Sequence, residues 1–314
     1  MITNNPEISV VIPMYNCEKF IRNCLMSLKA QTYQNFEVII VDNGSTDSSA
    51  EEAEKICRTD ERFSLIKSSS GKAGSARNAG IERSRGNYIA FVDGDDTVKE
   101  KYLEEMYRAA VENNADIAVC GFWFYFLNTG KIVIGDNPPK FHVYDRIEAL
   151  KELLRDKTMR FYLWNKLWKR SLFTENNIKI PDMYYEDAVV CPRLFCNAEK
   201  VVTVDYCGYV YMRAFSKYKE IRMTKERINN YINTVPMIRL CLEEQNIYKQ
   251  VKSSFRTHIF HVFFALPSLV IQAKEELKNG VLKNMVSGMA KVIKYSTMPT
   301  EELKTFQINN DTVQ

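Results

Sequence analysis

The segment ISVVIPMYNCEKFIRNCLMSLKAQTYQNFEVIIVD, residues 8–42, has the pattern of a strand, a helix and a second strand. Residues 8–15 and 35–42 are rich in β-branched side chains, which favour strands. Between them, apolar residues recur at the three- and four-residue spacing of one helix face. Two strands joined by a helix of this length pair in parallel through a right-handed crossover. The segment therefore predicts a βαβ unit.

The same alternation continues to residue 93. Helix patterns occur in 44–57 and 72–84, and strand patterns in 63–68 and 87–93. Strands that alternate with helices form an open α/β sheet, which binds its ligands at the carboxyl ends of the strands. The first 100 residues therefore predict a scaffold of the nucleotide-binding type.

The domain organisation changes after residue 100. A mixed α+β pattern runs to about residue 220, and only helical patterns follow. We therefore expect one domain over residues 1–220, made of the nucleotide-binding half 1–100 and a second half 101–220. A helical segment over 221–314 is expected to follow it.

Composition predicts a globular chain in a reducing compartment. The chain has 314 residues, of which 46% are hydrophobic, enough to bury a large core. Its eight cysteines include no CxxC pair, which favours packed, reduced thiols. The amino terminus has no signal-peptide pattern, and the longest apolar run, residues 259–273, is too short to span a bilayer. We expect a cytoplasmic protein without a transmembrane helix.

Basic charge gathers in the C-terminal part. The net charge is +4, but residues 1–100 carry 12 Lys and Arg against 15 Asp and Glu, which leaves 31 against 24 for the rest. A basic segment of this kind can face phosphates, an anionic membrane surface, or only solvent. The Phe and Leu stripe at 255–271 is more typical of a protein core or a homo-oligomer interface than of a membrane anchor. A basic helical segment nevertheless also suits peripheral membrane association.

Carboxylates gather at the predicted strand ends. Asp42 and Asp93 each end a strand, so both are expected in the ligand crevice. Asp93 and Asp95 form a D-x-D, whose hard oxygens select Mg²⁺ or Mn²⁺. The alternative is a solvated acidic turn or a helix cap. For Asp96, support of the metal and capping of the next helix both stay open.

A glycine-rich segment, SSSGKAGSARNAG at 68–80, precedes this cluster. Its glycines surround Lys72 and Arg77, and such a bend before a helix can present N–H groups and positive charge to phosphate. It matches neither a Walker loop nor G-x-G-x-x-G. A turn that allows close helix packing explains it equally well.

Seven ordered blocks resemble a known family. SVVIPMYN (9–16), VIIVDNGSTDSS (38–49), AGSARNAGI (73–81) and GNYIAFVDGDD (86–96) closely resemble the family 2 inverting glycosyltransferases. The later blocks resemble bacterial members that build capsular and lipopolysaccharide chains; they are WNKLWKRSLF (164–173), YYEDAVVCPRLF (184–195) and YVYMRAFS (209–216). The resemblance implies an α/β GT-A fold, a Rossmann-like open mixed sheet flanked by helices, with an appended C-terminal helical segment.

The resemblance also implies a donor site for a nucleotide-diphospho-sugar. By the family pattern, Pro13 and Tyr15 line the nucleotide pocket, and Asp42 accepts a hydrogen bond from uracil, which favours a UDP-sugar. A carboxylate can accept from an imide N–H. The second half, residues 101–220, would then serve the acceptor.

The same pattern assigns the diphosphate end of the donor. Arg77 would lie by the diphosphate or sugar, and Asp93 by the ribose or sugar. Asp95 would bind the Mg²⁺ or Mn²⁺ ion that bridges the diphosphate. Lys72 is a further phosphate candidate.

An acidic pair supplies the remaining chemistry. Inverting transfer needs a base that takes the acceptor hydroxyl's proton. The resemblance assigns this role to Asp187, with Glu186 as its neighbour. The alternative is an acidic pair that stabilises a helix N-terminus.

Two later blocks supply weaker candidates. Trp164 and Lys166 form either an acceptor-side wall or buried packing. Arg213 and Ser216 resemble a Y-x-R-x-x-S block that closes over the diphosphate, although this version differs from the pattern beside the arginine.

The expected function is inverting transfer of a sugar to an acceptor hydroxyl. The acceptor would be a glycan or lipid-linked saccharide in bacterial cell-surface polysaccharide synthesis, with no nucleic-acid partner. One alternative is an inactive sugar-nucleotide-binding or scaffold protein of the same fold. A nucleotidyltransferase is disfavoured because PMYNCEKF (13–20) lacks a basic glycine-rich loop after the first strand.

Overall fold

The structure is a computed structural model that describes residues 5–68, 72–127, 129–136, 139–213, 223–273, 277 and 280–304. The chain forms two compact units, each discontinuous in sequence. The first comprises Met1–Asp145, Tyr162–Asp182 and Asn197–Lys219. The second comprises Arg146–Phe161, Met183–Cys196 and Glu220–Gln314.

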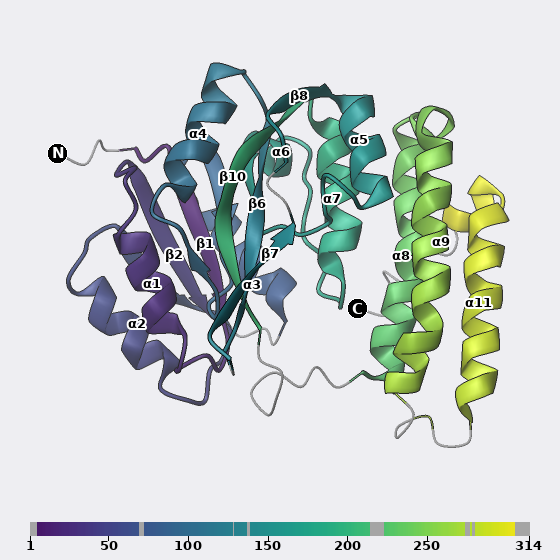
Figure 1. Cartoon of the computed structure of the whole chain (residues 1–314), viewed down its shortest axis with the longest axis horizontal. Helices are drawn as coiled ribbons and strands as arrows, with labels where there is room; N and C mark the ends of the chain where they lie inside the picture. The colour runs from purple at the N-terminus through teal and green to yellow at the C-terminus, as the bar shows by residue number, and fades with distance from the viewer. Residues whose placement is uncertain are drawn as a thin grey trace. The chain divides into compact units, whose positions relative to one another are not determined.

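The first unit is built on a ten-stranded mixed sheet (Figure 1). Its order is β3-β2-β1-β4-β9-β6-β10-β5, with β7 beside β6 and β8 beside β10. The strands are β1 (Ile8–Met14), β2 (Phe36–Asp42), β3 (Phe63–Lys67), β4 (Tyr88–Phe91), β5 (Thr97–Val98), β6 (Ile117–Phe126), β7 (Lys131–Asp136), β8 (His142–Asp145), β9 (Lys166–Lys169) and β10 (Lys200–Arg213). The open α/β sheet expected from the sequence is confirmed.

Helices cover both faces of this sheet. They are α1 (Ile21–Lys29), α2 (Ser49–Cys57), α3 (Ala73–Arg83), α4 (Tyr102–Glu112) and the short α6 (Ser171–Thr174). Side chains of α1, α2 and α4 join one large core with Val10, Ile12 and Val38. On the other face, Ala76 of α3 packs with Ile39 and Val41. Alternate strand residues thus serve opposite faces, as the two-residue period of a strand requires.

Strand β1 lies in the middle of the parallel part. It pairs in parallel with β2 and with β4, so the carboxyl ends of all three strands lie at one edge. Helix α3 approaches β1 closely at Gly80, where an added Cβ would lie 2.2 Å from Val11 Cγ1. A glycine here lets α3 pack directly on the sheet, so its first turn is held near that edge.

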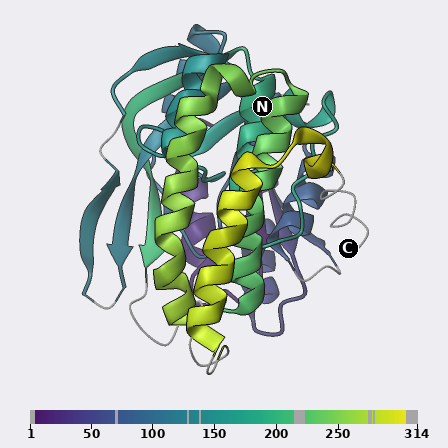
Figure 2. The same cartoon turned by 90° about the vertical axis from the view of Figure 1, so that its right-hand side faces the viewer.

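The second unit is helical in its described part. Its helices are α5 (Arg146–Arg155), α7 (Glu186–Asn197), α8 (Lys225–Glu244), α9 (Tyr248–Gln272) and α11 (Val281–Thr297). Helix α8 begins at the Thr224 cap, whose side chain accepts from Arg227 N at 3.2 Å. Helix α9 packs against α5, α8 and α11, and Figure 2 shows α9 beside α11. The appended helical segment expected from the sequence is confirmed.

Helix α9 is longer than its apolar run indicated. It has 25 residues and, by length and composition alone, could cross a membrane, with 33% of its most apolar window buried. It is the one such helix among the described residues. Of its Phe and Leu stripe, Phe255 and Leu266 are fully buried, whereas Phe260 and Phe264 are exposed. The stripe is therefore divided between a core side and a surface side.

Candidate functional site

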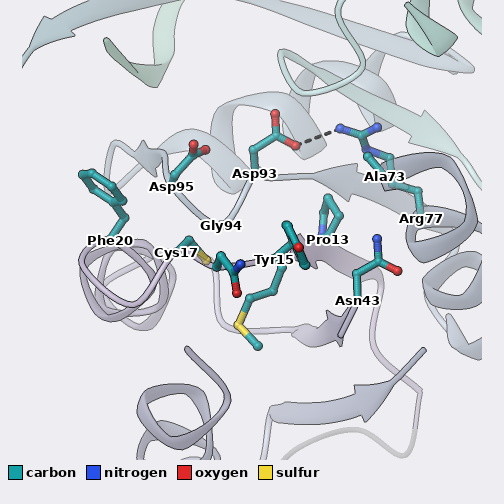
Figure 3. A pocket seen from close by; sticks show the side chains of 12 residues that line it. Pro13, Tyr15, Cys17, Phe20, Asn43, Ala73, Arg77, Asp93, Gly94 and Asp95 are labelled. Carbon is teal, nitrogen blue, oxygen red and sulfur yellow. Dashed lines mark hydrogen bonds and ion pairs between the residues drawn. The ribbon is translucent and has the colours of Figure 1, made fainter. Parts of the chain in front are cut away.

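A pocket opens at the carboxyl edge of the parallel strands (Figure 3). Its volume is about 370 Å³. Its walls come from the end of β1, the loop after β2, the start of α3 and the loop after β4. The lining residues are Pro13, Met14, Tyr15, Asn16, Cys17, Phe20, Asn43, Ala73, Arg77, Asp93, Gly94 and Asp95. A parallel sheet offers its ligand site at this edge.

Five residues singled out in the sequence meet in this pocket: Pro13, Tyr15, Arg77, Asp93 and Asp95. Tyr15 is 57% exposed, so its ring is available to a flat ligand. The turn after it is held by Asn16, whose φ is 46°. The Asn16 side chain accepts from Thr46 N at 2.8 Å, which ties this turn to the loop after β2.

An ion pair joins two residues of the pocket lining. Arg77 Nη2 donates to Asp93 Oδ1 at 2.9 Å, and Figure 3 shows the two side chains pointing toward each other. The Arg77 side chain is 7% exposed and that of Asp93 is 25% exposed. A shielded guanidinium next to a partly open carboxylate offers donors to an anion and acceptors to hydroxyl groups in one place.

Asp95 lies on the same rim as Asp93, one residue beyond Gly94 (Figure 3). An added Cβ at Gly94 would lie 3.1 Å from Cys17 Sγ, so the loop passes closely over the end of β1. Cys17 is also part of the lining. Burial, with a smaller contribution from Asp95, raises the pKa of its thiol to about 12. A thiol with a raised pKa stays protonated at neutral pH, so Cys17 contributes a neutral side chain to the lining.

The carboxylates suit one kind of metal site. No group of three His, Cys, Asp or Glu residues that could hold a metal occurs in the described part of the chain. Mg²⁺ needs no such cage, because it usually takes one or two carboxylates and completes its shell with water and substrate phosphates. Asp95 and Asp93, on the rim of a pocket that also contains Arg77, fit a cation bound in that way.

Asp96 has a different environment from its neighbours. Its side chain is fully buried and accepts from Tyr209 Oη and from Met212 N, both at 2.8 Å. Of the two roles left open for Asp96, capping of the next helix does not occur, because α4 begins after Lys101 and has no side-chain cap. The two partners lie on β10, more than a hundred residues away in sequence, so a local pattern could not reveal them.

Tyr209 joins both ends of the acidic loop. Its hydroxyl donates to Asp96 and accepts from Asp93 N at 3.1 Å. Burial, together with the nearby Asp96 and Asp93, raises the pKa of Tyr209 well above its ordinary value. The phenol therefore stays protonated and can donate. Through this hydroxyl, β10 fixes the loop that carries Asp93 and Asp95.

Asp42 ends β2 as expected but does not line the pocket. It is 5% exposed, and its Oδ1 accepts from Ser45 N at 2.9 Å. The next residue, Asn43, does line the pocket, and its amide donates to Lys72 O at 2.9 Å. Lys72 precedes α3, and its Nζ donates to Asp182 O at 3.2 Å. Lys72 is thus near the pocket in sequence but is not part of its lining.

The acidic pair lies in the second unit. Glu186 and Asp187 begin α7, and Asp187 Oδ1 accepts from Ala188 N at 2.8 Å. Both side chains are partly exposed. The preceding Tyr185 has a φ of 63°, a left-handed conformation that a bulky residue adopts only under constraint.

Trp164 and Lys166 are packing residues in this structure. Trp164 is 7% exposed, and its ring stacks on those of Tyr209 and Tyr162 at 4.3 and 4.6 Å. Lys166 has no exposed surface, and its Nζ donates to Tyr162 O and Asn165 Oδ1. A lysine so enclosed cannot contact an external phosphate. Of the two roles left open for Trp164 and Lys166, buried packing is the one that this structure shows.

Arg213 ends β10, and its guanidinium lies 4.3 Å from the centroid of the Phe124 ring. This stacked arginine is exposed. Ser216, the other residue of that block, lies outside the described residues.

Sequence reasoning missed part of the pocket. Asn16, Cys17, Phe20 and Asn43 line it but were not singled out. Two of them had a usable signal, because Asn16 and Asn43 directly follow a strand end inside a recognised block. The others could not be found, since their part in the lining depends on how α1 packs beside the acidic loop.

Comparisons with a family model, with curated relatives and with solved structures all point to glycosyltransferases. The family model described as "Glycosyl transferase family 2" matches residues 9–176. The putative glycosyltransferase EpsH of Bacillus subtilis is 37% identical over 176 residues, which is 56% of this chain and 51% of EpsH. The chain spans less than two thirds of the length of the curated relatives that it matches first.

Solved structures share the fold. S. aureus TarS residues 1–349 in complex with UDP-GlcNAc has a TM-score of 0.69 at 17% identity, covering 92% of this chain and 91% of that one. The mannosyltransferase PcManGT from Pyrobaculum calidifontis, in complex with GDP-Man and Mn²⁺, has a TM-score of 0.55 at 15% identity, covering 98% and 88%.

Proposed function

Because this chain belongs to glycosyl transferase family 2 and has the GT-A fold, we propose that it transfers a sugar, with inversion, from a UDP-sugar to an acceptor hydroxyl. The acceptor is a glycan or lipid-linked saccharide in bacterial cell-surface polysaccharide synthesis, reached from the cytoplasm. The observation that carries the proposal is the pocket at the carboxyl edge of β1 and β4, where Tyr15, the Arg77–Asp93 ion pair and Asp95 meet.

The nucleotide is proposed to bind between the ends of β1 and β2. Pro13 and the exposed ring of Tyr15 offer apolar surface to the base and ribose. Asp42 is proposed to accept the uracil N–H. Its Oδ1 already accepts from Ser45 N, but a carboxylate has several acceptor positions. The complex of TarS with UDP-GlcNAc supports a UDP-sugar as the donor class.

The diphosphate is proposed to lie over the ion pair. Arg77 supplies fixed N–H donors to the phosphate oxygens, and Asp93 accepts from a ribose or sugar hydroxyl. Asp95, supported by Asp93, would hold Mg²⁺ or Mn²⁺, which supplies Lewis-acid stabilisation of charge on the leaving diphosphate. Lys72, Arg213 and Ser216 are further candidates for the phosphates.

Asp187 is proposed as the general base. The acceptor oxygen attacks the anomeric carbon as the bond from that carbon to the diphosphate oxygen breaks, and the hydroxyl proton passes to the Asp187 carboxylate. One displacement of this kind inverts the anomeric centre. Glu186 is its acidic neighbour on the first turn of α7 and the second candidate for this role.

The test is release of UDP from a panel of UDP-sugars, with Mn²⁺ or Mg²⁺ and with candidate acceptors. The proposal expects acceptor-dependent release with one or a few of these sugars, and a product of inverted anomeric configuration. Calorimetry of the same donors separates the alternatives. Tight binding of UDP-sugars with no release under any condition would identify an inactive binding protein, whereas retained configuration would remove the single-displacement mechanism.

A further inference from the structure

Helices α9 and α11 of the second unit each expose a stripe of large apolar side chains. Phe260, Phe264 and Ile271 of α9 are 61%, 71% and 55% exposed, and Val286 and Ile293 of α11 are 59% and 56% exposed. We call these five residues the apolar face. Single exposed apolar residues are ordinary, but a group of them on neighbouring helices marks an interaction surface.

The apolar face points away from the bundle core. On the core side, an added Cβ at Gly288 of α11 would lie 3.7 Å from Leu266 of α9, and Leu266 is fully buried. With about 100° of rotation per residue, the exposed side chains lie roughly 120–160° around each helix from these two positions. Because α9 and α11 pack against each other, as Figure 2 shows, the two stripes are carried by adjacent helices.

The charge on these two helices has one sign. Together they contain six Lys and Arg residues and no Asp or Glu. All six basic side chains are exposed: Lys249, Lys252, Arg256, Lys283, Lys291 and Lys294. A partner for this surface must therefore be both apolar and negatively charged. A second copy of the chain would bring basic residues against basic residues, which is unfavourable.

We propose that the apolar face of α9 and α11 binds the surface of an anionic lipid bilayer. Exposed apolar side chains flanked by Lys and Arg are the feature by which helices lie in the membrane interface. The apolar side chains enter the boundary between head groups and acyl chains, and the basic side chains meet the lipid phosphates.

Helix α9 lies on this membrane and does not cross it. Its opposite side, which includes Val251, Phe255 and Val262, is buried in the second unit. That side packs against α5, α8 and α11, so insertion across a bilayer would require these contacts to break.

This binding goes beyond the proposed transfer reaction, and it would bring the enzyme to a lipid-linked acceptor. Its test needs no donor or acceptor, so its failure and that of the transfer proposal are distinguishable. The assay is co-sedimentation of the full chain with vesicles of phosphatidylcholine alone and with vesicles of phosphatidylcholine and phosphatidylglycerol in equal amounts. We expect sedimentation with the anionic vesicles, weakened by added salt, and little with the neutral ones.

The apolar part of the face is tested by Phe260→Ser combined with Phe264→Ser. Affinity for anionic vesicles should fall roughly tenfold or more, because two aromatic side chains no longer leave water. The matched control is Phe141→Ser in the first unit, where Phe141 is 58% exposed and off the face. It should bind as the wild type does. An unchanged melting temperature in all variants would establish that they are folded.

The basic part is tested by Lys283→Glu combined with Lys294→Glu, with the exposed Lys131→Glu on β7 as control. The double variant should lose anionic vesicle binding, and the control should keep it. Failure of the wild type to sediment with anionic vesicles would overturn the proposal. Equal binding by the Phe260→Ser, Phe264→Ser variant would overturn it as well. A wild-type dimer that this variant dissociates, without vesicle binding, would assign the face to a second copy.

Discussion

Replacement of Tyr209 by phenylalanine isolates the hydroxyl that holds the acidic loop. The hydroxyl donates to Asp96 Oδ2 at 2.8 Å and accepts from Asp93 N at 3.1 Å. The ring itself stays in place, because it stacks on Trp164 at 4.3 Å and packs edge-on against Tyr102 at 6.3 Å. Tyr209→Phe therefore removes two hydrogen bonds and little packing.

The expected loss of stability follows from the groups left behind. Asp96 has no exposed surface, so the lost bond to its carboxylate contributes about 1.5–3 kcal/mol, and the bond to Asp93 N contributes about 1 kcal/mol. Tyr209→Phe should lower the free energy of unfolding by roughly 2.5–4 kcal/mol. It should also weaken UDP binding, because the loop that carries Asp93 and Asp95 loses its anchor.

The assay is urea denaturation followed by tryptophan fluorescence. All three tryptophans, Trp123, Trp164 and Trp168, lie in the first unit, so the signal reports that unit. The matched control is Tyr102→Phe. Tyr102 is equally buried, but its hydroxyl donates to the neutral Trp164 O at 2.9 Å. The control should lose only about 1 kcal/mol and keep its UDP affinity. Equal losses in both variants would refute the charge-assisted anchor.

Three further predictions concern the metal ligand Asp95, the recognition of uracil by Asp42, and the pH dependence of stability. Asp95→Ala should abolish Mn²⁺-dependent UDP binding with little loss of stability, because a ligand is removed from a crowded acidic loop; calorimetry that finds the same metal-dependent affinity would contradict this. Asp42→Ala should weaken UDP binding and relax the preference for uracil, whereas equal weakening for every nucleotide would exclude a base-reading role. Burial, and then the charge of His261, lowers the pKa of His258 from 6.5 to about 4. As pH falls, His258 is therefore protonated in the unfolded chain before it is protonated in the folded one. The free energy of unfolding should be highest above pH 6.5 and should decline toward pH 4 by up to about 3 kcal/mol. His258→Phe should flatten this dependence in unfolding followed by circular dichroism, and an equal decline in the variant would count against it.

The sequence predicts the parallel half of the sheet well because its signals are local. Runs of β-branched residues mark β1 and β2, which are buried along nearly their whole length. The three- and four-residue spacing of its buried apolar residues marks α1, again to within a few residues. The exact start of α2 is less evident from the sequence, because Ser45, Thr46, Asp47 and Ser48 are all residue types that cap helices. In the structure Ser48 precedes the helix without a side-chain cap, and Asp47 accepts from Ser49 N and Glu18 N.

The site was predictable only as far as its contacts are close in sequence. Blocks at strand ends led to Tyr15, Asp93 and Asp95, which do meet in one pocket. The hydrogen bond between Asp96 and Tyr209 could not be predicted, because Tyr209 lies on β10, which comes more than a hundred residues later in the chain. Periodicity likewise could not reveal that residues 183–196 cluster with the C-terminal helices, since that depends on packing between distant segments.

The most direct test of sugar transfer is UDP release from the preferred UDP-sugar and acceptor by the wild type and by Asp187→Asn, with UDP affinity measured on the same preparations. Wild-type turnover should be readily detected, and the variant should be slower by roughly 10²-fold or more, because asparagine keeps the size of the side chain but cannot take the proton. UDP affinity should be the same in both proteins. A folded Asp187→Asn variant with near-normal turnover would contradict the assigned base, and a wild type that binds UDP but releases none from any UDP-sugar would contradict transfer itself.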